Sequence, residues 1–149
     1  MSRALKLLVV AVLVGCTKAD APAVDTAAAP VPEVAAAPNA AGTWSVNVMP
    51  EGRDTTLLTY TMVATNDTTG WRMTLPGRDP MDVRILHMSA DSIVVHNGPY
   101  ASVLQPGTQV TTHSNVRIDG DRLTGTTVAT YARSGGDSVV NLRLDGRRQ

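Results

Sequence analysis

The chain has 149 residues, with 13 Lys and Arg against 13 Asp and Glu, one Cys, no Phe and 43% hydrophobic residues. This length accommodates one modest domain with extensions. Zero net charge argues against a nucleic-acid partner, which requires a basic surface, and one Cys excludes an intrachain disulfide and a multi-cysteine zinc site.

The amino terminus has the pattern of a secretory signal peptide. Arg3 and Lys6 accompany eight consecutive apolar residues, 7–14, far fewer than the roughly 20 that a membrane-spanning helix needs. The following Gly15-Cys16 completes a Leu-Val-Gly-Cys sequence that resembles the lipobox of bacterial lipoprotein precursors. The resemblance implies a signal peptide at 1–15, cleavage between Gly15 and Cys16, and covalent diacylglycerol and acyl groups on Cys16. It implies no other cofactor.

The same resemblance predicts where the protein is located. Thr17 follows the Cys, at the position where an acidic residue retains lipoproteins in the inner membrane of some bacteria. Thr is not acidic, so this signal is missing here. We therefore expect a lipid-anchored protein of the cell envelope, at the outer membrane rather than the inner one, facing the periplasm or the cell surface. Several acyl chains would give a stable membrane anchor.

Residues 16–41 are mostly Ala, Pro and Val after the anchoring Cys. Prolines recur too often for a helix, because each removes a backbone donor and restricts the residue before it. Strand-like alternation is also missing. The segment is predicted to be a flexible linker, extended at up to about 3.1 Å per residue.

From Gly42 the composition changes, and residues 42–149 are predicted to form an all-β domain. Runs rich in Val, Ile, Thr and Tyr favour strands, and no segment has sustained helical periodicity. Turn signals separate the runs; they are 50–52, 66–67, 76–77, 97–99, 106–107, 119–120, 134–136 and 145–146.

Several runs alternate between apolar and polar residues. One face is predicted for each of the following groups: Trp44, Val46 and Val48; Leu58, Tyr60, Met62 and Ala64; Val83, Ile85 and His87; Val140, Leu142 and Leu144. Asp119-Gly120 predicts a tight hairpin. About eight strands joined by short turns indicate a small antiparallel meander barrel, since closure removes unpaired edges. A β-sandwich is the alternative.

The opening Gly42-Thr43-Trp44 resembles the G-x-W signature of lipocalins and the wider calycin group. In that family the Trp packs under an Arg of the final strand, which implies Arg143 as the partner of Trp44 through a cation–π contact. The T-D-Y motif and the C-terminal helix of that family are missing. The stretch 42–144 is also similar to small lipocalin-like β-domains of bacterial secreted proteins. These domains share the opening motif and short sequence segments such as residues 120–126. Those domains imply no catalysis of their own.

The sequence nominates no catalytic residue and no metal site. It contains no G-x-S-x-G or H-E-x-x-H motif, and turn hydrogen bonding accounts for Asp residues beside turns. A turn at Ala90 would place His96 across from Arg84 and away from His87, so we expect the three histidines, including His113, to serve surface or core roles.

We therefore expect a non-enzymatic interaction module or accessory subunit of an envelope complex. The alternative is a carrier of a small apolar ligand, and an enzyme is the least favoured class. Only 38 of the 108 residues from Gly42 onward are hydrophobic, which argues against a large lipid cavity. The residues predicted to line a cavity, or to fill the core in its place, are Trp44, Tyr60, Met62, Ile85, Tyr100 and Tyr131.

Overall fold

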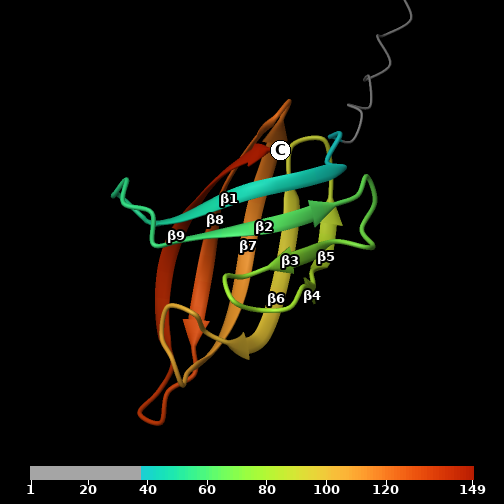
Figure 1. Ribbon diagram of the computed structural model, residues 1–149. Coiled ribbons are helices and arrows are strands. Elements are labelled where there is room, and N and C mark those ends of the chain that lie inside the picture. Colours follow the sequence, from blue (N-terminus) through green and yellow to red (C-terminus); the bar gives the residue numbers. More distant parts are fainter. Residues whose placement is uncertain (1–37) are drawn as a thin grey trace, which may run out of the picture. The chain divides into compact units, whose positions relative to one another are not determined.

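A computed structural model of the protein describes residues 38–149, which contain nine β-strands (Figure 1). The predicted signal peptide, Cys16 and residues 16–37 of the predicted linker lie outside the described residues. The strands are β1 (Gly42–Pro50), β2 (Leu58–Ala64), β3 (Arg72–Thr74), β4 (Met81–Asp82), β5 (Arg84–Met88), β6 (Ile93–Ala101), β7 (Gln109–Asp119), β8 (Arg122–Tyr131) and β9 (Ser138–Arg148). No helix within residues 38–149 is long and apolar enough to cross a membrane.

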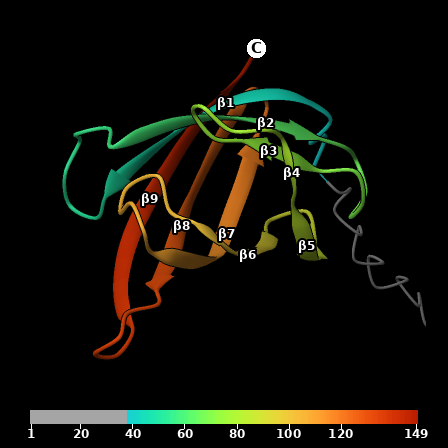
Figure 2. The same cartoon turned by 60° about the horizontal axis from the view of Figure 1, so that its bottom comes forward.

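All nine strands belong to one antiparallel sheet, in the order β4-β3-β2-β1-β9-β8-β7-β6-β5. Its outermost strands, β4 and β5, are separated along the chain by Val83 alone. The Val83 amide donates a hydrogen bond to the Trp71 carbonyl at 2.9 Å. The sheet thus curls back on itself and is nearly closed (Figure 2). The predicted all-β meander barrel is confirmed.

The barrel has eight strands if β4 and β5 are counted as two parts of one bent strand. On one side of the bend β4 pairs with β3, and on the other side β5 pairs with β6. A register shift between Ile85 and His87 then interrupts the alternation of β5. For this reason His87 is exposed and does not share the buried face of Val83 and Ile85, as the alternation had predicted.

Alternation along the strands separates the barrel interior from its outer wall. In β7 every second residue from Val110 to Ile118 is buried, and the residues between them are partly or fully exposed. The same period places Trp44, Val46 and Val48 of β1 inside. Burial of these aliphatic and indole side chains supplies the main stabilisation of the fold, because apolar surface removed from water contributes roughly 25 cal/mol per Å².

Two of the predicted turns lie inside strands. The Asn97-Gly98-Pro99 signal falls within β6, where the pairing with β7 shifts register between Asn97 and Tyr100. The Asp145-Gly146 signal falls within β9. A β-carbon on Gly146 would approach Leu123 Cβ to 3.1 Å and Val46 Cγ2 to 3.2 Å, so glycine here allows close packing against its partners on the two neighbouring strands, β8 and β1.

The predicted hairpin between β7 and β8 is present, one residue later than expected. Asp119 pairs with Arg122, so Gly120 and Asp121 form the two-residue turn. Gly120 has a φ of 57°, a conformation that suits glycine.

Strand directions divide the loops between two ends of the barrel. The first strand begins at one end, at Gly42, and the last strand ends there, at Arg148; we call it the closed end. Loops 51–57, 75–80, 102–108 and 132–137 lie at the opposite end, which we call the mouth. The chain therefore enters the barrel at the closed end, on the side away from the mouth.

Candidate functional site

The closed end is sealed by Trp44. Its side chain is fully buried, and the indole Nε1 donates a hydrogen bond to the Ala40 carbonyl at 2.9 Å. Ala40 is itself fully buried in the core cluster. Ala40 therefore packs as part of the barrel, two residues before β1 begins.

A guanidinium group covers the Trp44 indole, and it belongs to Arg148. The Arg148 Cζ lies 4.4 Å from the indole centroid, and the Nε donates to Asp121 Oδ1 at 2.9 Å. The same guanidinium hydrogen-bonds to the Ala41 carbonyl. This cap fixes the entering chain and the end of β9 to one ring, which closes the barrel at this end.

The expectation that Arg143 would cover Trp44 is wrong. Arg143 pairs across the strands with Met49 and forms an ion pair with Asp54, on the outer side of the barrel. Arg148 instead pairs directly opposite Trp44. Because successive residues of a strand point to opposite faces, Arg143 cannot share the interior with Leu142 and Leu144.

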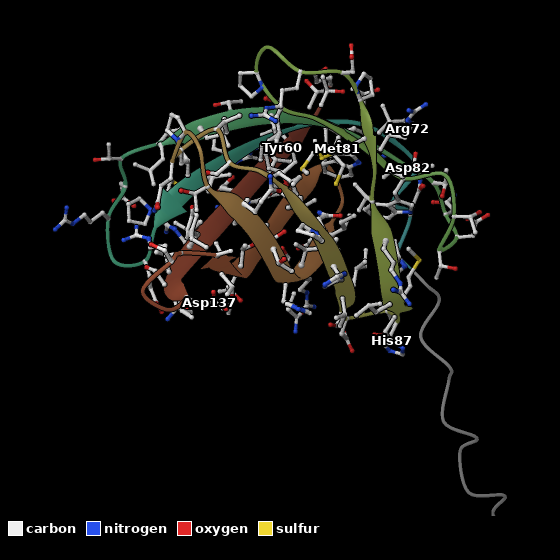
Figure 3. All side chains as sticks on the ribbon, turned by 90° about the horizontal axis from the view of Figure 1, so that it is seen from below. Tyr60, Arg72, Met81, Asp82, His87 and Asp137 are labelled. Atoms are coloured by element: carbon white, nitrogen blue, oxygen red, sulfur yellow. The ribbon has the colours of Figure 1, made fainter. Side chains whose placement is uncertain are left out.

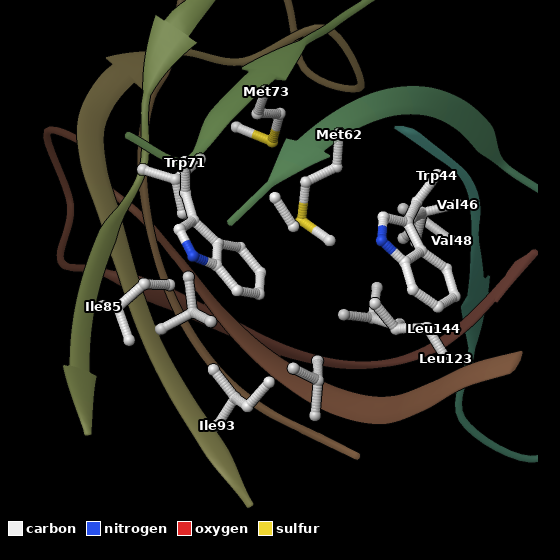
Figure 4. Close-up of a cluster of buried hydrophobic side chains, with 14 of the residues drawn as sticks. Trp44, Val46, Val48, Met62, Trp71, Met73, Ile85, Ile93, Leu123 and Leu144 are labelled. Atoms are coloured by element: carbon white, nitrogen blue, oxygen red, sulfur yellow. The ribbon is translucent and has the colours of Figure 1, made fainter. Parts of the chain in front are cut away.

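Apolar side chains fill the middle of the barrel. Trp71, Met62, Met73 and Ile85 pack there, with Trp71 only 1% exposed (Figure 4). A residual cavity of about 20 Å³ lies beside Met62 and Met73, enough for about one water molecule. Trp44 and Ile85, two of the predicted cavity residues, line neither this space nor the larger one described next, and they belong to the filled core.

A larger cavity, of about 60 Å³, lies on the mouth side of this core. All three tyrosines of the chain line it, as predicted for Tyr60, Tyr100 and Tyr131. We call it the tyrosine cavity. Its apolar side is formed by residues such as Met73, Leu75 and Leu142. Tyr60 also lines an outer groove with Met81, near the β3–β4 loop (Figure 3).

The tyrosine cavity also has a polar lining, which we call the polar wall and which was not predicted from the sequence. It consists of Asn97, Thr112, Ser114 and Thr127. The Ser114 and Thr127 hydroxyls share a hydrogen bond of 2.6 Å, whereas the buried Asn97 Oδ1 has no hydrogen-bond partner among residues 38–149. A signal existed, because Thr112 and Ser114 alternate in phase with Val110 and Val116.

The surroundings of the three tyrosine hydroxyls raise their pKa values. Burial, and then the neighbouring Tyr100, raise the pKa of Tyr60 far above that of an ordinary tyrosine. Burial also raises the pKa of Tyr100, although a hydrogen bond with Thr112 partly offsets it. The pKa of Tyr131 is raised by burial as well, against the opposing effect of a hydrogen bond with Ser102. These hydroxyls are suited to neutral hydrogen bonding and not to acting as bases.

Above the tyrosine cavity, the mouth loops form an open groove of about 820 Å³. We call it the mouth groove. Leu58, Ser102, Val103 and Leu104 line both the groove and the cavity. Its other apolar side chains are Leu57, which is 45% exposed, Pro76, Ala101 and Pro106, and Arg78 provides a positive charge at the rim.

The histidines do not enter this site. His96 lies opposite Arg84, as expected, and its ring is also next to that of His113 on the outer wall. Among the described residues there is no group of three or more His, Cys, Asp or Glu side chains that could hold a metal ion.

Comparison of the chain with protein-family models, curated proteins and solved structures finds no match.

Proposed function

We propose that the protein is a non-enzymatic interaction module of the bacterial cell envelope, anchored in the membrane through lipid on Cys16. Its barrel docks a protein partner at the mouth groove, as an accessory subunit of a membrane complex. The lipobox-like sequence supports the anchor, and the arrangement of groove and filled barrel supports the docking site.

One observation carries the docking proposal: the barrel interior is nearly filled, whereas an apolar groove lies outside it, between the mouth loops. The tyrosine cavity measures about 60 Å³, whereas pockets for ordinary small ligands measure about 300–1,000 Å³. The mouth groove, in contrast, is open to solvent and is bordered by Leu57, Leu58 and Leu104. Exposed apolar side chains gathered between loops are typical of protein interaction sites. The groove thus suits an extended or helical segment of a partner.

The attachment of the tether favours this use. The chain enters at the closed end, where Ala40 and Ala41 are held against Trp44 and Arg148. The mouth lies at the opposite end of the barrel. The described chain therefore starts at the end of the barrel opposite the mouth. The predicted extended linker would give the groove reach from the membrane.

The mouth can be tested against a matched site on the outer wall. Leu57 and Val63 are both 45% exposed, but only Leu57 lines the groove. We expect Leu57→Ser to reduce co-purification of the membrane complex after mild detergent extraction, and Val63→Ser to leave it unchanged. Equal recovery with both variants, or equal loss, would contradict docking at the mouth.

A second candidate function is the carriage of a very small ligand, favoured by the unpaired Asn97 Oδ1 beside the tyrosine cavity. Such a ligand would donate a hydrogen bond to this oxygen. A fatty acid is too large for the cavity, so titration with one should leave the tryptophan fluorescence unchanged. A saturable shift that Ala129→Leu, which fills the cavity without adding a tryptophan, abolishes would instead support a lipid carrier.

A further inference from the structure

Two histidines meet on the outer wall of the barrel, away from the mouth. His96 of β6 pairs directly with His113 of β7 in the antiparallel register. Their ring centroids lie 4.4 Å apart, with the ring planes inclined by 54°. His113 is exposed and His96 is half-buried, so solvent reaches the pair.

The spacing of the rings allows both imidazoles to bind one metal ion once their nitrogens turn toward it. With metal–nitrogen bonds of about 2.0 Å and each nitrogen roughly 1.1 Å from its ring centroid, ligands at about 90° place the centroids roughly 4.5 Å apart. The observed 4.4 Å is close to this value. A right angle between neighbouring ligands is the square-planar arrangement that Cu²⁺ prefers.

The charges around the pair determine which ion it would accept and how strongly. Arg84 lies opposite His96 on β5, and Val128 lies opposite His113 on β8. These neighbours bring one positive charge and no carboxylate, which opposes hard cations and limits the affinity. Neutral imidazole nitrogens bind late first-row metals, most strongly Cu²⁺.

We propose that His96 and His113 form a two-histidine surface site for a divalent transition-metal ion, with Cu²⁺ bound more tightly than Zn²⁺. Water or an external ligand completes the coordination, because the described residues offer no third ligand nearby. The site is independent of the docking function proposed above, since it lies on the outer faces of β6 and β7 and shares no residue with the mouth groove.

The test is calorimetric titration with CuCl₂, in a weakly coordinating buffer, of the full-length chain carrying Cys16→Ala, because the Cys16 thiol would itself bind and reduce Cu²⁺. We expect one Cu²⁺ ion per chain. His96→Gln and His113→Gln should each weaken binding by about tenfold or more, which corresponds to about 1.4 kcal/mol. His87→Gln is the matched control, because His87 is the third histidine, is exposed and lies outside the pair; it should bind as the wild type does.

Electron paramagnetic resonance of the Cu²⁺ complex gives a second readout that does not depend on stability. The wild type should show hyperfine coupling to two imidazole nitrogens, and each pair variant should lose one of them. Absence of Cu²⁺ binding by the wild type would overturn the proposal. It would also be overturned by a His87→Gln defect as large as that of His96→Gln, or by unchanged binding in the two pair variants.

Discussion

The guanidinium of Arg148 lies 4.4 Å from the centre of the Trp44 indole, directly across the β1–β9 pairing. This contact joins the first strand of the barrel to the last, and it involves the carbonyl of Ala41 and the carboxylate of Asp121 as well. The barrel is therefore held at its closed end by one residue that contacts three separate parts of the chain.

The first prediction concerns this closure. Arg148→Ala should lower the free energy of unfolding by about 2 kcal/mol, because it removes a cation–π contact and hydrogen bonds from a charged donor. Arg143→Ala, in the same strand, should cost at most about 0.5 kcal/mol, since it breaks an exposed ion pair with Asp54 and a weak contact with Met49 Sδ. Urea unfolding followed by tryptophan fluorescence measures both. Similar losses for the two variants would show that the contact between Arg148 and Trp44 does not stabilise the fold more than an exposed ion pair does.

The second prediction concerns Gly125 in the middle of β8. A β-carbon there would lie 2.4 Å from the Asn115 carbonyl oxygen and 2.9 Å from Val116 Cα, both in the backbone of β7. Gly125→Ala should destabilise the domain by about 1–3 kcal/mol, the usual cost of overpacking. Gly135→Ala is the control, because its β-carbon would meet no atom within 4 Å. Equal losses of thermal stability in the two variants would contradict the close packing of Gly125 against β7.

The third prediction concerns alkaline pH. Burial raises the pKa of Tyr60 far above its ordinary value of 10.0. Below pH 10 the hydroxyl is neutral in both the folded and the unfolded chain, so stability is complete. Above pH 10 only the unfolded chain ionises, and stability falls by up to about 1.4 kcal/mol per pH unit.

Tyr60→Phe should therefore lose less stability than the wild type between pH 10 and pH 11, by that linkage. Burial also raises the pKa values of Tyr100 and Tyr131, but both tyrosines are present in the variant and in the wild type, so the difference between the two slopes reports Tyr60. The sequence from Gly42 onward has no Lys, and Arg stays protonated in this range. Urea unfolding at pH 8, 10 and 11 measures the slopes. The same pH slope in the variant and the wild type would contradict burial of the neutral hydroxyl.

The fourth prediction concerns the anchor. Cys16→Ala should leave an uncleaved precursor without lipid, because the thiol is the proposed acceptor and cleavage follows its modification. Metabolic labelling with palmitate and fractionation of the membranes measure both effects. Cys16→Ser would be expected to fail in the same way, and normal processing and membrane retention of either variant would overturn the lipoprotein proposal.

The sequence alone could predict most of the barrel, because a two-residue alternation is a direct consequence of strand geometry. It located the buried faces of β1 and β9 and the hairpin after β7. It was misled at Gly146, where a glycine required for close packing with Leu123 was taken as part of a turn. That error ended the last strand too early and left Arg143 as the only arginine within it.

The candidate site was less accessible to prediction. The tyrosines could be named, but the polar wall of Thr112, Ser114 and Thr127 could not be told from the Thr-rich outer wall by composition. The meeting of His96 with His113 depends on the register between β6 and β7. That register is set by the bulge at Asn97–Tyr100 and by the 102–108 loop. The length of neither segment is enough to predict from the sequence which residues of the two strands pair.

The most direct test of docking at the mouth is photo-crosslinking in intact cells. A photoreactive amino acid replaces Leu104 in the mouth groove, or Asp119 beside the hairpin at the closed end. We expect one discrete crosslinked protein from position 104 that also co-purifies with the wild type, and none from position 119. A product from position 119 alone, or the same products from both positions, would contradict it.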